Sequence, residues 1–140
     1  KMKNNKLFIE VLKRENLKCT PQRLAVYQNV INSKKHRESE QIYKDVNSKV
    51  NVSLATVYRT LDLLVKNNFI RKMDIGDGKF IYETKLNHPH HDHMICVECG
   101  KIIEFHEEKI EELQDKVCEN INFKIIRHIH QLFGVCKECQ

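Results

Sequence analysis

Two Cys-x-x-Cys pairs constrain this chain more than any other feature. Cys96 and Cys99 form the first pair, and Cys136 and Cys139 form the second, at the end of the 140 residues. Disulfides could form in principle, but in a chain without a visible secretory signal such pairs more often bind metal. Four thiolates complete the tetrahedral shell of zinc and leave no position for a substrate. We therefore expect a structural zinc site that ties the first strand of a C-terminal domain to its last.

A histidine-rich segment directly before the first pair predicts a second kind of metal site. Residues 88–93 read His-Pro-His-His-Asp-His, and imidazole and carboxylate groups suit borderline divalent metals. In a strand, His91 and His93 would share one face, whereas His90 and Asp92 would share the other. This alternation divides the ligands between two sites. Two acidic residues farther along can add oxygen ligands: Glu104 and Glu111.

The charge of the chain is distributed unevenly. Residues 1–83 hold 17 Lys and Arg against 9 Asp and Glu, whereas residues 84–140 hold 7 against 10. Seven of the eight histidines and five of the six cysteines lie in the second part. The basic part is suited to nucleic acid and the acidic part to cations. We expect a DNA-binding domain at 2–84, a hinge at 85–89 and a metal-binding dimerisation domain at 90–140.

Capping residues and apolar spacing predict a winged helix-turn-helix in the first domain. Thr20 and Pro21 are favoured at a helix start, and Ser39 and Ser53 are good N-caps. A Gly76-Asp77-Gly78 connection between two short strands is a hairpin signal. The expected elements are helices at 7–15 and 21–33, a third capped by Ser39, a fourth from Ser53 to about Asn68, and strands at 69–75 and 79–84.

The second domain is expected to be a small sheet with one helix, so that the whole chain has an α+β fold. Strands are predicted at 93–97, 102–105 and 123–133. A helix at 107–120 would turn Ile110, Leu113 and Val117 inward. An uncovered sheet edge can pair with a second copy, which predicts a homodimer. The sequence has no apolar run of 18 residues, so we expect a cytoplasmic protein without a membrane partner.

Three residues of the first domain are candidates for contact with DNA. Tyr58 and Arg59 lie near the start of the fourth helix, where a recognition helix reaches base edges. Arginine can bind guanine through two hydrogen bonds, and tyrosine can contact a thymine methyl group or the backbone. Lys18, before the second helix, could enter a minor groove or contact phosphate. The alternatives are a solvated helix face and an ordinary surface lysine.

Two further candidate ligands lie outside the histidine-rich segment. His36 lies in the loop before the third helix, and Glu83 ends the hairpin. A site that used both residues together with His91 and His93 would bridge the two domains, and metal binding would then fix their relative orientation. The remaining histidines are expected at the surface or in supporting roles, and the remaining cysteines as buried or half-buried residues: His88, His106, His130, Cys19 and Cys118.

These motifs together resemble the ferric uptake regulator (Fur) family of bacterial metal-dependent repressors. The resemblance covers nearly the whole chain and includes residues 17–23, Ala-Thr-Val-Tyr-Arg-Thr-Leu at 55–61, residues 90–93 and both cysteine pairs. It implies a winged-helix domain, an α/β dimerisation domain, and a homodimer that binds AT-rich inverted repeats when loaded with metal.

The resemblance also implies a role for individual residues. The structural zinc ligands would be Cys96, Cys99, Cys136 and Cys139. A regulatory site at the hinge would use His36, Glu83, His91, His93 and Glu104. A second site in the dimerisation domain would use His90, Asp92, Glu111 and His128. The DNA contacts would come from Lys18, Tyr58 and Arg59.

The metal sensed is most consistent with Fe(II). The peroxide-sensing branch of the family typically carries aspartates where this chain has Glu83 and Glu104, which favours an iron sensor. A zinc or manganese sensor stays an alternative, because affinity follows the divalent series whatever the biological role. Outside the family, the alternatives are a metalloenzyme whose His/Asp site activates water and a metal-storage module. The metalloenzyme lacks a candidate catalytic base separate from the ligands and a suggested substrate pocket, so we expect no enzyme. The storage module leaves the basic first domain, Tyr58 and Arg59 unexplained.

Overall fold

The computed structural model describes residues 2–86 and 89–140 of the chain. It divides into two compact units, residues 1–88 and 89–140, which are described separately. The expected hinge at 85–89 includes residues 87 and 88, which lie outside the described residues, as does the ambiguous His88.

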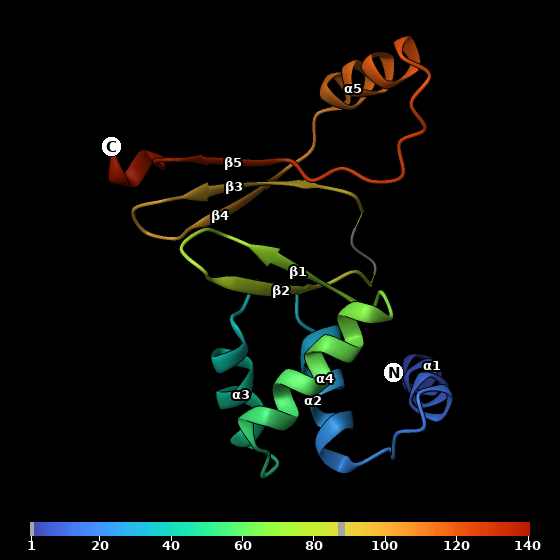
Figure 1. The fold of residues 1–140 in the computed structure, drawn as a ribbon. Coiled ribbons are helices and arrows are strands. Elements are labelled where there is room, and N and C mark those ends of the chain that lie inside the picture. The colour runs from blue at the N-terminus through green and yellow to red at the C-terminus, as the bar shows by residue number, and fades with distance from the viewer. Residues whose placement is uncertain (1, 87–88) are drawn as a thin grey trace. The chain divides into compact units, whose positions relative to one another are not determined.

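The first unit begins with helices, and most of their expected caps are present. The helices are α1 (Met2–Arg14), α2 (Pro21–Ile31), α3 (Ser39–Asn47) and α4 (Leu54–Lys66) (Figure 1). The Thr20 hydroxyl accepts from the N–H of Arg23 at 3.2 Å, and the Ser53 hydroxyl caps α4 in the same way. Ser39 was wrongly expected as a cap. Glu38 takes that position, because the Gln41 side chain accepts from its N–H at 3.0 Å.

A hairpin of β1 (Ile70–Asp74) and β2 (Phe80–Thr84) follows the helices. All three residues of the Gly76-Asp77-Gly78 turn have positive φ, a conformation that glycine adopts readily. The core of the unit includes Phe8, which stacks on Tyr27 with a centroid distance of 4.3 Å. The predicted winged helix-turn-helix is therefore confirmed.

The second unit is a three-stranded sheet, a helix and a terminal 3-10 turn. Its elements are β3 (Asp92–Cys96), β4 (Ile102–Phe105), α5 (Glu108–Asn120), β5 (Gln131–Gly134) and the turn Lys137–Cys139. The strand order is β4-β3-β5, with β5 parallel to β3 (Figure 1). The α+β fold class is confirmed.

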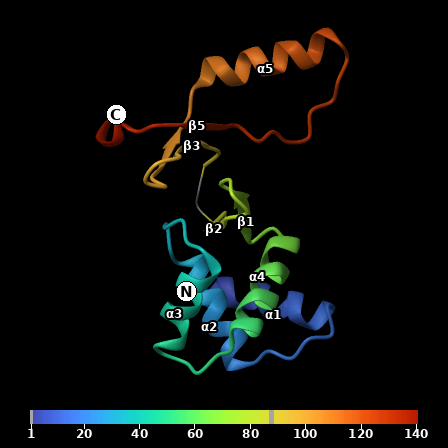
Figure 2. The same cartoon turned by 60° about the vertical axis from the view of Figure 1, so that its left-hand side comes forward.

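The expected strand at 123–133 is wrong over most of its length. Only residues from Gln131 onward pair with β3, in the register His93↔Gln131. Because β3 begins at Asp92, its pairing with the returning chain begins with the bond from the His93 N–H to the His130 carbonyl and does not extend back to residue 123. The chain returns from α5 without regular structure there (Figure 2).

The apolar face of α5 is also not buried as predicted. Leu113 and Val117 are each 63% exposed, and Ile110 is 37% exposed. In the following segment Ile126 and Ile129 are 92% and 74% exposed. Within the described part of the second unit, no helix or strand covers this surface, because α5 stands apart from the sheet (Figure 1). We find no described helix with the length and apolar character that a membrane crossing requires.

Candidate metal centres and DNA-reading helix

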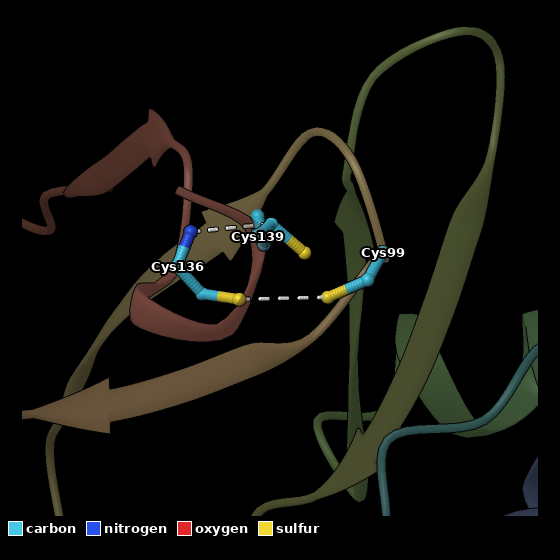
Figure 3. Close-up of side chains that lie close together, drawn as sticks. Cys99, Cys136 and Cys139 are labelled. Atoms are coloured by element: carbon cyan, nitrogen blue, oxygen red, sulfur yellow. Dashed lines mark hydrogen bonds between the residues drawn. The ribbon is translucent and has the colours of Figure 1, made fainter.

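The four paired cysteines converge within the second unit. Cys96 ends β3, and Cys99 lies in the turn to β4. Cys136 directly precedes the terminal 3-10 turn, and Cys139 is its last residue. The four sulfur atoms lie within 4.8 Å of one another. Figure 3 shows Cys99 and Cys136 pointing toward each other, with Cys139 beside them. The sulfur atoms of Cys99 and Cys136 are 3.8 Å apart. In a tetrahedral zinc site with Zn–S bonds of about 2.3 Å, two sulfur atoms are also about 3.8 Å apart. The donor set therefore fits zinc.

The titration of these thiols agrees with a cation site. The pKa of Cys96 is lowered to about 6, chiefly because the backbone N–H of Cys136 donates to its sulfur at 3.3 Å. The pKa of Cys139 is raised to about 12, chiefly by hydrogen bonding with Cys136. Four crowded sulfurs cannot all ionise without a balancing charge, which a bound divalent cation would supply.

A second cluster forms where three segments of the second unit meet. His90 precedes β3, Asp92 begins it, Glu111 lies in the first turn of α5, and His128 lies in the returning segment. The His128 Nε2 atom is 3.2 Å from Asp92 Oδ1 and 3.5 Å from Glu111 Oε1. The His90 Nε2 atom is 3.3 Å from the same Glu111 oxygen. Two imidazoles and two carboxylates around one point form a donor set that fits a borderline divalent metal.

The five residues predicted for the hinge site are divided between the units. In the first unit, the His36 Nε2 atom lies 2.6 Å from Glu83 Oε2. In the second, the His91 Nε2 atom lies 3.5 Å from Glu104 Oε1, and the rings of His91 and His93 are 4.8 Å apart. Each set by itself already brings together imidazole and carboxylate.

Sequence reasoning missed a residue that supports the first of these sets. Arg71 pairs with Glu83 across the hairpin, and its Nη1 donates to Glu83 Oε1 at 3.3 Å. The glycine-rich turn predicts the hairpin, and its register could have revealed this pair. Cys19 was expected to be buried or half-buried, but it is exposed because it lies in the turn between α1 and α2. Cys118 is half-buried as expected.

The candidate DNA contacts lie on exposed surface of the first unit. Tyr58 is 41% exposed and Arg59 is exposed beside it, in the first half of α4. The opposite side of α4 is buried through Val57, Leu61 and Leu64. This burial holds the helix against the core and leaves its outer side available. Lys18 is exposed in the turn before α2.

Comparison with known proteins agrees with these features. The model of the ferric uptake regulator family matches residues 14–133. The ferric uptake regulation protein of Campylobacter jejuni is 39% identical over 135 residues, covering 94% of this chain and 85% of that one. The peroxide operon regulator of Bacillus subtilis is 33% identical over 132 residues, with 94% and 90% covered.

A solved structure extends the likeness to the fold. The ferric uptake regulator of Helicobacter pylori, described as having three functional metal-binding sites, superposes with a TM-score of 0.87 at 37% identity. The match covers 96% of this chain and 89% of that one. The proteins of this family are dimeric, DNA-binding transcriptional regulators. The sequence, the fold and the match over most of the chain agree, and the chain belongs to the ferric uptake regulator family.

Proposed function

We propose that this protein is a transcriptional repressor that binds DNA when Fe(II) joins its two units. The observation that carries the proposal is the division of the histidine and carboxylate donors. His36 and Glu83 belong to the winged helix, and the other three belong to the second unit: His91, His93 and Glu104. A metal held by both sets would restrict the orientation of the winged helix, which is the part that reads DNA.

The covalent connection favours this joint site. Glu83 and His91 are eight residues apart in the sequence, so the chain between them spans at most about 28 Å. Short connections hold tethered groups at an effective concentration in roughly the millimolar range. A metal bound by the second unit would therefore meet the first-unit donors at that effective concentration, which favours a site shared by both units.

Iron is supported by the names of the relatives and by the glutamates at positions 83 and 104. The donor set of imidazoles and carboxylates suits Fe(II), and it also accepts Mn(II) and Zn(II). A peroxide-, zinc- or manganese-sensing role is the alternative within the family, and the Bacillus subtilis relative represents the peroxide branch. For the cysteine cluster we propose Zn(II) in a purely structural role, because four protein thiolates fill its coordination shell.

We further propose that the operator is an AT-rich inverted repeat bound by a homodimer. A twofold dimer presents two recognition helices, and a duplex with two related half-sites matches that symmetry. Tyr58 and Arg59 would contact bases and Lys18 the minor groove or phosphates. The exposed apolar residues of α5 and the returning segment offer the surface that a second copy would cover. Such a regulator works at the chromosome, which places it in the cytoplasm.

A regulatory role accounts for the basic winged helix, whereas a metalloenzyme or a storage protein does not. A hydrolase would turn over simple esters or phosphates faster than the free metal does, and we expect no such excess. A storage module would bind a specific duplex no better than random DNA. We expect a clear preference that weakens with salt, as contacts to phosphate require.

Fluorescence anisotropy with a labelled AT-rich inverted repeat tests the proposal. Zinc-loaded protein would be titrated anaerobically with Fe(II), Mn(II) and Zn(II) in separate experiments at fixed salt. We expect tight binding only after metal addition, and loss of the metal response in His91→Ala and His93→Ala with the cysteine-bound zinc retained. Binding that is equal with and without added metal would contradict the proposed switch.

A further inference from the structure

The two carboxylate oxygens of Asp92 have different surroundings. Asp92 is 3% exposed. Its Oδ1 atom faces the other candidate ligands of the second cluster, with His128 Nε2 at 3.2 Å and His90 Nε2 at 3.6 Å. Its Oδ2 atom is buried and accepts no hydrogen bond from the described residues. The His130 Nδ1 atom, on that side, is 3.9 Å away.

An unsatisfied oxygen of this kind is costly. A buried acceptor without a partner costs about 1–3 kcal/mol, and a charged one costs more. A hydrogen bond from an imidazole N–H to a carboxylate is about 2.8 Å long, so the gap of 3.9 Å is about 1 Å too wide. We expect a rotation of the His130 side chain to close this gap.

The main chain holds His130 in place for that contact. Its carbonyl accepts from the N–H of His93 at 3.3 Å, next to the first residue pair of β3 and β5. Its ring meets the Phe105 ring edge-on, with centroids 5.4 Å apart. The side chain is 31% exposed, so rotation about its own bonds is the freedom that remains.

We propose that His130 is a positioning residue of the second metal site. It donates from Nδ1 to Asp92 Oδ2 and so keeps Oδ1 directed toward His90, Glu111 and His128. It does not bind the metal itself, because it approaches the carboxylate from the oxygen that faces away from that cluster. This inference depends on metal binding at the second cluster, which we propose here for His90, Asp92, Glu111 and His128.

Hydrogen bonds to a ligating carboxylate fix its orientation, and loss of such a partner typically weakens metal binding 10- to 100-fold. We expect His130→Ala to weaken the second site by that factor without removing it. His130→Asn should recover most of the affinity, since its amide nitrogen lies about where Nδ1 lies and also donates. His106→Ala is the matched control, since it removes an exposed histidine whose ring meets that of His90 edge-on, with centroids 6.2 Å apart, whereas His130 faces Asp92.

The experiment uses full-length, zinc-loaded protein carrying His91→Ala, so that the proposed hinge site does not bind. Co(II) is the probe, and its binding is followed by visible absorption and by calorimetry. Each zinc-loaded variant is also thermally unfolded without Co(II), so that differences in folding can be recognised. Weaker binding at unchanged stoichiometry in His130→Ala, with recovery in His130→Asn, supports the proposal.

Unchanged Co(II) affinity in His130→Ala overturns it. Loss of one full Co(II) equivalent, as expected for His128→Ala, also overturns it, because His130 would then be a ligand. A parent protein that binds no Co(II) beyond its zinc, with His128→Ala behaving identically, would show instead that the second metal site itself does not exist. These outcomes separate failure of the positioning role from failure of the site.

Discussion

Replacement of His36 by alanine gives the sharpest quantitative test of the proposed switch. To move a winged helix from 1% to 99% in the DNA-binding arrangement, metal must favour that arrangement by about 5.5 kcal/mol. The first unit contributes two donors, His36 and Glu83, and only these contacts distinguish the joined arrangement from the open one. If they share the energy equally, each supplies about 2.7 kcal/mol, or about a factor of 100.

His36→Ala therefore leaves about half of the protomers in the joined arrangement at saturating metal. Both protomers of a dimer are then competent in about a quarter of the molecules, against nearly all in the unchanged protein. The loss in metal affinity is larger. Access to the joined arrangement strengthens metal binding about 100-fold in the unchanged protein but only about twofold in the variant. The metal concentration that half-activates DNA binding should therefore rise about fiftyfold.

The assay is the anisotropy titration with Mn(II), which avoids oxidation during the experiment. His106→Ala serves as the control, because it removes an exposed histidine outside the candidate hinge site, and its midpoint should not move. The proposed role of His36 would be refuted if His36→Ala needed the same metal concentration as the unchanged protein to half-activate DNA binding. His36 would then not stabilise the joined arrangement.

Three other expectations concern the zinc site, the DNA interface and surface electrostatics. Cys99→Ser should lose zinc and dissociate to monomers in light scattering, while the helical circular dichroism of the first unit persists; a stable dimer without zinc would contradict this. Arg59→Ala should cost about 1–3 kcal/mol of DNA-binding free energy and relax the sequence preference. Lys18→Ala should weaken binding to all duplexes alike and lower the salt dependence of the affinity by about one phosphate contact. Identical behaviour of the two variants would contradict a base contact for Arg59 and a phosphate contact for Lys18. The pKa of Glu15 is lowered, chiefly by the hydrogen bond from Lys66, so the pair stabilises the fold above the ordinary glutamate value of 4.5 and this contribution disappears as the pH falls through the lowered value. Urea denaturation should then separate Glu15→Gln from the unchanged protein at pH 7, and the difference should shrink as the pH is lowered below 4.5. A difference that stays constant with pH would exclude the ion pair as its cause.

Local signals predicted the first unit well. Thr20 and Ser53 cap helices as expected because a hydroxyl before a helix satisfies a specific N–H, a rule that needs only nearby residues. The glycine-rich turn predicts the hairpin for the same reason, since positive φ is a property of single residues. Ser39 failed as a cap because the Gln41 side chain accepts from the N–H of Glu38, which makes Glu38 the residue that precedes the helix.

The second unit was less predictable because its structure depends on contacts that are not local. Aromatic and β-branched residues such as Phe123, Ile126 and Ile129 are typical of a strand, but a strand needs a partner, and β3 is too short to provide one there. The amphipathic pattern of α5 correctly predicts a helix, yet no described helix or strand of the second unit covers its apolar face. A pattern shows which face is apolar and does not show what will cover it.

The candidate metal sites show the same contrast. The cysteine pairs and the alternation from His90 to His93 predicted which residues cluster in the second unit, because ligand chemistry limits the choices. His130 could not be assigned, since its place beside Asp92 depends on where the returning segment joins the sheet. The membership of the hinge site stays a prediction.

The small core of the second unit couples its folding to its own abundance. Among the described residues of that unit, the buried apolar side chains are only Ile95 and Cys96. Such a unit gains much of its stability from a second copy, so folding and association become one bimolecular reaction. Each tenfold dilution then weakens the folded pair by about 1.4 kcal/mol. A cell that halves its stock of this protein loses more than half of the folded dimer, so copy number acts as an input to regulation beside the metal.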